Sequence, residues 1–411
     1  MQGQSRGILA IIGQGYVGLP LSVAAAKVGW TVIGIDKSSK VIEGLRQGRS
    51  HIEDVSSATL SELLARKSYR PTESFEEISS AEICVVCVPT PLDENGNPNT
   101  EILESAIESV APHLKAGTVL INESTSYPGT LRDLIFKIME KHRAEGVSEI
   151  HFASAPERID PNNDKWDLKS TPRLVSGLDR EATDLAKSFY STICSQVIEV
   201  SSPEVAEMAK LLENTFRQVN IALVNQLVPF SRELGIDIRE VIKAAGTKPY
   251  GYMEFYPGAG VGGHCIPIDP MYLLWKSRQL GIDLPFIENA DRVNANMPAY
   301  VSKRLVEIIK DDKSKNVLIC GVSYKSGVAD LRESPAHQVA LELEKMGYKV
   351  LWSDPLVESF QGFEKYSNQG LCGAIIVTAQ VGLDRQFIEN LKVPVLDCTG
   401  VFSLATNAIQ L

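Results

Sequence analysis

Short apolar runs alternate with longer segments of helical periodicity over the first half of the chain. The short runs are rich in β-branched residues and predict strands at residues 8–12, 31–36, 83–88, 118–122, 151–154 and 196–200. Between them, apolar residues recur at helical spacing and predict helices at 19–29, 39–47, 57–66, 100–115, 130–142 and 180–193. This alternation favours a parallel sheet with helices on both faces.

The middle of the chain is predicted to be helical. Residues 201–204 read Ser-Ser-Pro-Glu, and a hydroxyl cap, a proline in the first turn and an early acid all favour a helix N-terminus. The helical pattern continues to about residue 234, and Pro229 is expected to bend this long helix. Further helices are expected at 237–245, 269–279 and 285–309.

After residue 316 the alternation of strands and helices resumes. Strands are expected at 317–322, 349–353, 374–378 and 393–396, and the run 316–321 has the same pattern as residues 9–13. The predicted fold class is α/β, with two Rossmann-like doubly wound domains joined by a helical central domain that contains a long helix. The expected boundaries are 1–200, 201–310 and 311–411.

Composition narrows the class of protein. The net charge of −10, with no basic block, disfavours a nucleic-acid partner. No apolar run reaches roughly 18 residues, so no membrane span is expected, and the polar residues 1–7 lead directly into a strand rather than a signal peptide. Cys84 and Cys87 share a predicted strand, where alternate side chains point apart, so no metal site is expected. The seven cysteines are expected to be reduced thiols of a cytoplasmic protein.

A glycine turn follows the first predicted strand. The hexapeptide 13–18 reads Gly-Gln-Gly-Tyr-Val-Gly, and such a turn lets a pyrophosphate approach the backbone at a helix N-terminus. Asp36 ends the second strand, where a carboxylate can bind a ribose diol and repel a 2′-phosphate, so NAD is favoured, although Lys37 leaves NADP open. A glycine turn that binds no dinucleotide is the alternative. The expected cofactor residues here are Gly13, Gly15, Tyr16, Val17, Gly18 and Asp36.

A second glycine loop surrounds Cys265. Residues 255–270 contain repeated glycines bounded by prolines, a composition that suits neither helix nor strand. An isolated cysteine is more often a small buried hydrophobic residue, but a cysteine in a rigid glycine loop is well placed to meet a ligand. Cys265 is therefore a candidate nucleophile.

Several motifs in order along the chain carry a resemblance. They are residues 88–91 (V-P-T-P), 123–125 with 128–130 (E-S-T and P-G-T), 155–158 (A-P-E-R), Lys210 with Asn214, the loop 260–270, and 324–325 with 330–335 (Y-K and D-L-R-E-S-P). With these motifs, nearly the whole chain resembles the UDP-glucose/GDP-mannose dehydrogenase family. The chain departs from the family pattern at Ala155, where a serine is usual, and at the turn 397–400, which lacks the family's basic residue.

The resemblance implies an NAD-dependent oxidation of a sugar CH2OH group to a carboxylate, with two NAD consumed per sugar. Because an aldehyde lacks a good hydride to donate, a thiolate must first add to it, and Cys265 would form this thiohemiacetal and then a thioester. Lys210 and Asn214, four residues apart on one helix face, would stabilise the thiolate or the oxyanion. Glu157 would activate the hydrolytic water with help from Thr125, and Asp269 would orient water or partner groups.

The resemblance also assigns binding residues. Those near the cofactor are Pro89, Thr90 and Thr125. Those expected to contact the substrate are Glu157, Arg158, Lys210, Asn214, Tyr256, Gly260, Gly262, Lys325 and Arg332. Of these, Arg332 and Lys325, together with the glycine loop, suit a sugar diphosphate.

His264 and residues 268–270 are more similar to family members that act on UDP-N-acetylhexosamines. UDP-N-acetylglucosamine is the favoured substrate, with UDP-N-acetylmannosamine next and UDP-glucose as a further alternative. A two-electron dehydrogenase of the hydroxyacid type, which would not need Cys265, and a non-catalytic nucleotide-sugar sensor are the rival functions. The implied product would feed bacterial surface polysaccharides, and the central helices suggest a homodimer or higher homo-oligomer.

Overall fold

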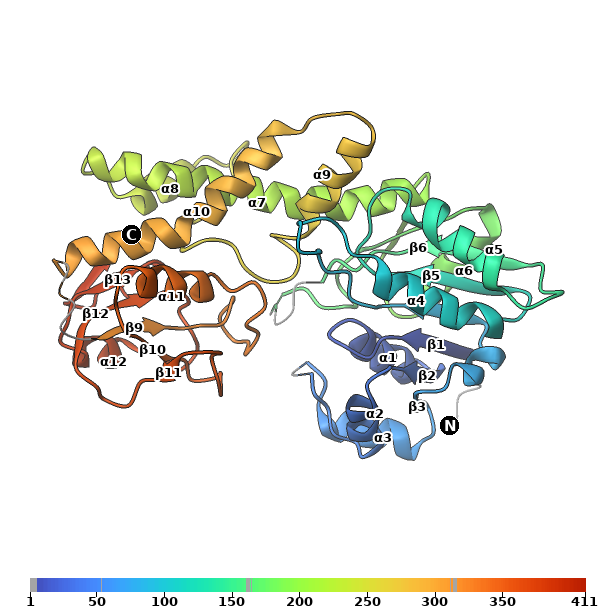
Figure 1. The fold of residues 1–411 in the computed structure, drawn as a ribbon. Coiled ribbons are helices and arrows are strands. Elements are labelled where there is room, and N and C mark those ends of the chain that lie inside the picture. The colour runs from blue at the N-terminus through green and yellow to red at the C-terminus, as the bar shows by residue number, and fades with distance from the viewer. Residues whose placement is uncertain (1–5, 53, 160–162, 164, 311, 313–315) are drawn as a thin grey trace. The chain divides into compact units, whose positions relative to one another are not determined.

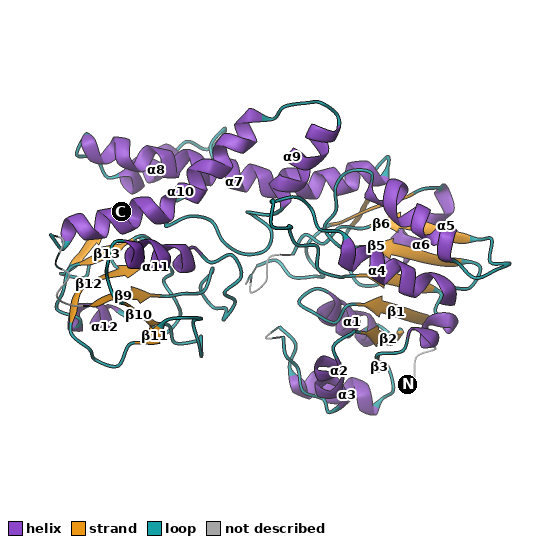
Figure 2. Ribbon diagram, viewed as in Figure 1, coloured by secondary structure: helices purple, strands orange, loops and turns teal. Residues whose placement is uncertain are grey.

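The computed structural model describes residues 6–52, 54–159, 163, 165–310, 312 and 316–411. The chain forms two compact units, Met1–Leu212 and Glu213–Leu411, called here the N-terminal unit and the C-terminal unit. Each contains one sheet with helices packed against it, as Figures 1 and 2 show.

The sheet of the N-terminal unit has, within the described residues, eight strands in the order β3-β2-β1-β4-β5-β6-β7-β8. These are β1 (Ile8–Ile12), β2 (Thr31–Ile35), β3 (Tyr69–Thr72), β4 (Ile83–Val86), β5 (Thr118–Asn122), β6 (Ile150–Ser154), β7 (Arg173–Gly177) and β8 (Val197–Glu199). The first six strands in this order, from β3 through β2 and β1 to β6, pair in parallel. Strand β7 runs antiparallel to β6. The amino end of β7 therefore lies at the carboxyl end of β6.

The helices of this unit begin where the sequence supplies caps. The hydroxyls of Ser38 and Ser56 and the carboxylate of Asp179 each accept a backbone N–H of the next helix. The α-helices are α1 (Gly18–Lys27), α2 (Ser39–Arg46), α3 (Ser57–Ala65), α4 (Glu101–Val110), α5 (Phe136–His142) and α6 (Arg180–Tyr190). Shorter 3₁₀ turns lie at Phe75–Ser80 and Ala111–His113, and a π-helical turn at Leu131–Ile135 precedes α5.

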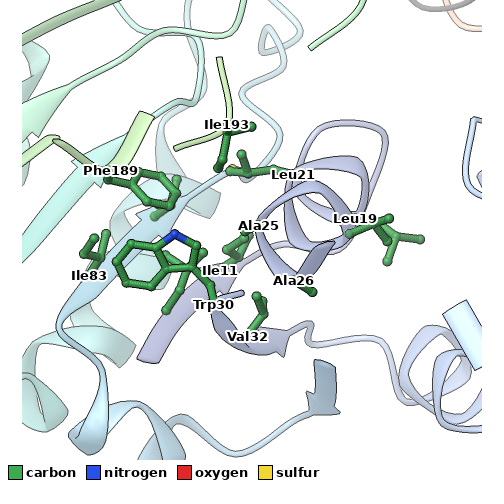
Figure 3. Packing of buried hydrophobic residues seen from close by; sticks show 14 of the residues in the cluster. Ile11, Leu19, Leu21, Ala25, Ala26, Trp30, Val32, Ile83, Phe189 and Ile193 are labelled. Carbon is green, nitrogen blue, oxygen red and sulfur yellow. The ribbon is translucent and has the colours of Figure 1, made fainter. Parts of the chain in front are cut away.

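Alternate residues of the strands enter two different cores. Leu9 and Ile11 of β1 pack in the core that also holds α1, α3 and α6, whereas Ala10 and Ile12 face α4 and α5. Figure 3 shows part of the first core, where the edge of Trp30 meets the ring of Phe189 at a centroid distance of 5.5 Å. Burial on both faces explains why these strands are apolar throughout.

The long helix α7 (Pro203–Glu233, 31 residues) starts in the N-terminal unit and continues into the C-terminal unit, with Pro229 inside it. The other helices of the C-terminal unit are α8 (Ile238–Gly246), α9 (Asp269–Gln279), α10 (Pro285–Ile308), α11 (Pro335–Lys345) and α12 (Arg385–Asn390). Its strands are β9 (Asn316–Cys320), β10 (Val350–Ser353), β11 (Glu364–Lys365), β12 (Leu371–Ile376), β13 (Val395–Asp397) and β14 (Ala408–Gln410). They pair in parallel in the order β11-β10-β9-β12-β13-β14.

The predicted fold class is confirmed: two doubly wound sheets are joined by a helical segment with one long helix. The first sheet is parallel from β3 to β6, as expected, and the unexpected strand β7 pairs antiparallel to β6. The elements β3, β7, β11, β14, α11 and α12 were not expected from the hydrophobic pattern. In the part of the chain that is described, no helix is both long and apolar enough to cross a membrane.

Candidate active site

The glycine turn 13–18 connects β1 to α1 and has the close packing that its sequence predicts. Gly13 has φ of +91°, and a Cβ placed there would lie 2.5 Å from the carbonyl oxygen of Cys87. A Cβ on Gly18 would lie 1.8 Å from the carbonyl oxygen of Gly13. A Cβ on Gly15 would meet nothing within 4 Å, so the middle glycine faces open space where a ligand can approach the backbone.

Asp36 closes this turn. Its Oδ2 accepts the backbone N–H of Gln14 at 2.9 Å and its Oδ1 accepts that of Ser38 at 2.9 Å. The side chain of Gln14 is buried, and its oxygen accepts hydrogen bonds from Tyr69 (2.8 Å) and Ser22 (3.1 Å). A half-buried carboxylate beside an open glycine turn fits the ribose and pyrophosphate of a dinucleotide. Sequence reasoning missed Gln14 and Tyr69, since Tyr69 lies on the unexpected strand β3.

The other expected cofactor residues surround the carboxyl ends of β1, β4 and β5. Tyr16 is exposed at the turn, and Val17 packs in part on the core beside α1. Pro89 is exposed and Thr90 is buried in the loop after β4. The hydroxyl of Ser124, next to Thr125, accepts the backbone N–H of Val88 at 2.9 Å and so ties the two loops together.

Lys210 and Thr125 are in direct contact in the N-terminal unit. The buried ammonium group of Lys210, on α7, donates a hydrogen bond to the hydroxyl of Thr125. One turn earlier, the carboxylate of Glu207 accepts the backbone N–H groups of Gly129 (2.7 Å) and Leu131 (3.0 Å). Burial raises the pKa of Glu207 to about 8, although both N–H groups favour its charged form. The start of α7 is therefore anchored to the loop after β5.

Glu157 lies in a buried polar cluster rather than in a surface ion pair with Arg158. Its Oε2 accepts Nη2 of Arg173 at 2.6 Å, and Nη1 of Arg158 instead donates to the carbonyl of Pro172 at 2.9 Å. The same Arg173 lies 3.6 Å from the buried Glu123, which also accepts hydrogen bonds from the hydroxyl of Tyr190 and the thiol of Cys87. Sequence reasoning missed Arg173 because it begins the unexpected antiparallel strand β7.

Cys265 in the C-terminal unit differs from the other cysteines: it is partly exposed, whereas all six others are buried. Its carbonyl accepts the backbone N–H of Asp269 at 2.9 Å, where α9 begins. Asp269 is fully buried, and its Oδ2 accepts Nδ2 of Asn214 at 2.6 Å. Asn214 and Asp269, both predicted to be catalytic, are therefore brought together.

Three glycines of the Cys265 loop, Gly260, Gly262 and Gly263, are required by close packing or by backbone conformation. A Cβ on Gly262 would lie 2.8 Å from the carbonyl oxygen of Glu333, and Gly263, with φ of +83°, donates its N–H to the carbonyl of Arg332 at 3.2 Å. Gly260 has φ of +136°. The loop therefore lies against the segment 324–335, which carries the expected substrate residues Lys325 and Arg332.

The remaining expected substrate residues are polar and accessible. The guanidinium of Arg332 is about half exposed and pairs with Asp330 at 2.6 Å. Lys325 is partly exposed in the same segment. The hydroxyl of Tyr256 donates to Glu254 at 2.6 Å, and its ring lies 5.7 Å from the guanidinium of Arg239.

Arg239 also reaches the turn 397–400, where the family's basic residue is missing. Its Nη2 donates to the carbonyl of Cys398 at 2.7 Å and to that of Pro257 at 2.9 Å. A Cβ on Gly400 would lie 2.6 Å from Nε of Arg239. A guanidinium from α8 thus lies against this turn.

A doubly wound sheet with an open glycine turn and an acid at the end of β2 defines a dinucleotide-binding oxidoreductase fold. Sequence models of three domains match this chain: the NAD binding domain at residues 8–194, the central domain at 204–296 and the UDP binding domain at 318–384 of the UDP-glucose/GDP-mannose dehydrogenase family. The chain belongs to this family and is an NAD-dependent nucleotide-sugar dehydrogenase.

Named relatives cover most of the chain. It is 35% identical to UDP-N-acetyl-D-glucosamine 6-dehydrogenase of Pseudomonas aeruginosa over 93% of each chain. It is 35% identical to UDP-N-acetyl-D-mannosamine dehydrogenase of Methanocaldococcus jannaschii over 86% of this chain and 80% of that one. The solved structure of UDP-D-ManNAc dehydrogenase from Pyrococcus horikoshii has a TM-score of 0.88, 29% identity and 98% coverage of both chains.

Proposed function

We propose that the protein oxidises the C6 hydroxymethyl of a UDP-N-acetylhexosamine to the uronate, with UDP-N-acetylglucosamine as the favoured substrate. The single observation that carries this proposal is the setting of Cys265, the one partly exposed cysteine, in a packed glycine loop at the start of α9. The relatives named above act on UDP-N-acetylhexosamines, and the loop residues His264 and 268–270 support the same substrate class.

Bound NAD would accept one hydride in each of two oxidations. Between them, the thiolate of Cys265 adds to the C6 aldehyde, and the new C–S bond holds a thiohemiacetal whose carbon bears a hydride to lose. The second oxidation leaves a thioester, and attack by water breaks the C–S bond and releases the carboxylate and the thiolate. A two-electron dehydrogenase of the hydroxyacid type would need none of the last three steps.

The polar residues of the two units have separate parts in this proposal. Lys210, held by Thr125, supplies a positive charge for the thiolate or the oxyanion, and Asn214 donates to the same oxygen. Asp269 orients Asn214 through their 2.6 Å hydrogen bond. Glu157 accepts a proton from the hydrolytic water.

The binding residues divide by ligand. The dinucleotide would contact Gly13, Gly15, Tyr16, Val17, Gly18, Asp36, Pro89, Thr90 and Thr125. The nucleotide sugar would contact Glu157, Arg158, Lys210, Asn214, Tyr256, Gly260, Gly262, Lys325 and Arg332.

In terms of domains, we propose a cofactor domain at 1–200, a central helical domain at 201–310 and a UDP-sugar domain at 311–411. Reduced thiols and NAD are typical of a cytoplasmic enzyme, and we propose that location.

The Cys265→Ser variant tests the chemistry. We expect loss of carboxylate formation, since serine is a far weaker nucleophile than a thiolate, with at most one NADH formed per sugar. The matched control is Cys372→Ser, a buried cysteine of the same unit that should retain two NADH per sugar. Full carboxylate and two NADH from Cys265→Ser would exclude the covalent route and favour the two-electron alternative.

A panel of UDP-glucose, UDP-N-acetylglucosamine, UDP-N-acetylmannosamine and GDP-mannose tests the substrate. NADH absorbance should rise most with UDP-N-acetylglucosamine. Activity with GDP-mannose alone would contradict the UDP assignment, and binding without NADH from any sugar would favour the sensor function.

We also propose that α7 forms a homodimer interface. Its exposed apolar residues recur at helical spacing and form one stripe: Val205, Met208, Leu212, Phe216, Leu223, Leu227 and Phe230. The double variant Leu223→Asp/Phe230→Asp should be monomeric in sedimentation, whereas Lys303→Asp on α10, which reverses an exposed charge, should leave the dimer intact. A monomeric wild-type protein would contradict the proposal.

A further inference from the structure

The hydrogen bonds of Glu157 leave little of its carboxylate available. Oε1 accepts the backbone N–H groups of Arg158 (2.6 Å) and Ile159 (2.8 Å), which use both of its lone pairs. Oε2 accepts Nη2 of Arg173 at 2.6 Å, which uses one. Among the described residues, the side chain of Glu157 can therefore accept one further hydrogen bond, on Oε2.

Arg173 holds the backbone of the same segment. Its side chain is 3% exposed, and Nη1 donates to the carbonyls of Ala155 (3.2 Å) and Pro156 (3.3 Å), the two residues before Glu157. The guanidinium also lies over the ring of Tyr190 at 5.0 Å. A planar, forked donor can bind two carbonyls and a carboxylate together, whereas a lysine ammonium cannot match this geometry.

A second carboxylate competes for the same cation. Glu123 is fully buried, and its Oε1 lies 3.6 Å from Nη1 of Arg173. One guanidinium cannot fully neutralise two buried carboxylates, so burial favours a proton on one of them. Burial, partly opposed by Arg173, raises the pKa of Glu123 to about 7. Burial would also raise the pKa of Glu157, but attraction to Arg173 and the hydrogen bonds from Arg173, Ile159 and Arg158 lower it.

We propose that Arg173 is a positioning residue that keeps Glu157 a carboxylate and directs its one available lone pair, on Oε2, to a single hydrogen-bond donor. In the proposed function, on which this inference rests, that donor is the hydrolytic water. Glu123 holds the proton of the cluster and does not act on the water.

Groups from three neighbouring elements face this pair. They are Cys87 after β4, Glu123 after β5, Tyr190 at the end of α6 and Cys194 in the loop that follows it, whereas Nη1 of Arg158 donates to the carbonyl of Pro172. Burial raises the pKa of Cys87, Tyr190 and Cys194, so these three stay neutral at neutral pH. Arg173 is thus the cation that decides the charge of Glu157.

The ionisation of Glu157 can be measured without substrate. In protein labelled with 13C at glutamate carboxyl carbons, the signal missing from Glu157→Gln identifies this residue. In the wild type this signal should not titrate between about pH 5.5 and 8.5, and in Arg173→Gln it should titrate within that range. Identical titrations in both proteins would overturn the proposal. This measurement stands even if no nucleotide sugar is oxidised, so it separates this inference from the proposed function.

Steady-state kinetics of Arg173 variants can separate the charge of Glu157 from the geometry of its hydrogen bonds. Arg173→Lys should keep Glu157 ionised but lower kcat about tenfold to a hundredfold, since the water loses its fixed acceptor, while KM changes little. Arg173→Gln should lower kcat as much and add an acid limb to the pH profile. Tyr190→Phe, in the same cluster, should keep kcat within about twofold and add no limb. Should Arg173→Gln fail to fold, as judged by circular dichroism, wild-type kcat in Arg173→Lys would still refute the positioning role.

Discussion

The two sheets begin in the same way and then diverge. After β1, Gly13 has φ of +91° and donates its N–H to the carbonyl of Ile35 at 2.7 Å. After β9, Gly321 has φ of +73° and donates to the carbonyl of Ser353 at 2.9 Å. In each sheet an aspartate follows the second strand, and its carboxylate accepts the backbone N–H of the residue after this glycine. Asp36 accepts that of Gln14 and Asp354 accepts that of Val322, both at 2.9 Å.

The acids differ in what else they bind. Asp36 is half-buried and each of its oxygens accepts one N–H, so lone pairs remain for a ribose. Asp354 is 2% exposed and accepts four backbone N–H groups: those of Val322, Ser323, Leu356 and Val357. The same position is therefore open to a ligand in one sheet and purely structural in the other.

The connection after the glycine differs as well. In the N-terminal unit α1 starts at Gly18, directly after the turn, so a helix N-terminus is available to an anion. In the C-terminal unit α11 starts only at Pro335, and the intervening segment packs against the Cys265 loop. A glycine and an acid specify the turn, but the connection and the burial decide whether it binds a ligand.

The largest effect is expected where both turns need glycine. A Cβ on Gly18 would lie 1.8 Å from a backbone oxygen, and one on Gly321 would lie 1.9 Å from the carbonyl oxygen of Thr378. Gly18→Ala and Gly321→Ala should each lower the free energy of unfolding by about 3 kcal/mol or more, measured by denaturant titration. If either variant were as stable as the wild type, the two turns would not share the requirement for a glycine.

The next largest effect on stability should distinguish Asp354 from Asp36. Asp354→Ala leaves four buried N–H groups without their acceptor and should cost about 2–4 kcal/mol of stability while NAD affinity is retained. Asp36→Ala should cost about 1 kcal/mol or less, because its region is solvated. A larger loss of stability from Asp36→Ala, in thermal unfolding of the two variants side by side, would show that the exposed acid is the structural one.

A pH-dependent stability is expected from the N-terminal unit, where Glu207 anchors α7. Its folded pKa of about 8 lies above the unfolded value of 4.5, so the folded protein holds the proton more tightly and stability falls as pH rises from about 4.5 through 8. Glu207→Gln should remove part of this fall, about 2 kcal/mol between pH 5 and 8 in denaturant titrations. The same slope in both proteins would assign it to other groups.

The smallest effect concerns the cofactor. Gly15→Ala meets no atom within 4 Å, so the fold should keep its stability, but the methyl group would stand in the space left for the pyrophosphate. NAD affinity measured by calorimetry should fall about tenfold, or about 1.4 kcal/mol. Gly370→Ala, at a glycine with open space around it and no left-handed backbone, is the matched control for adding a methyl group and should bind NAD as the wild type does. Unchanged affinity in Gly15→Ala would mean that the open turn does not face the cofactor.

Most regular elements could be predicted from the sequence, because their periodicity is local. The strands at 8–12 and 118–122 and the helix at 269–279 have the bounds that their apolar patterns predict. β7 could not be predicted in this way: it begins with a buried arginine, and its direction depends on pairing with β6. The short edge strands β11 and β14 carry little apolar pattern of their own, because they contain no buried residue and are defined by backbone pairing with β10 and β13.

By itself, the sequence determined the glycine turn with its acid and the glycine loop around Cys265, since backbone conformations that exclude side chains leave glycines at set positions. Only the tertiary structure decided the partners of the charged groups. Glu157 has Arg173 as its partner rather than the adjacent Arg158, because an antiparallel strand brings Arg173 to the carboxyl end of β6. Such pairings depend on the order and direction of strands, which distant contacts set and no local pattern encodes.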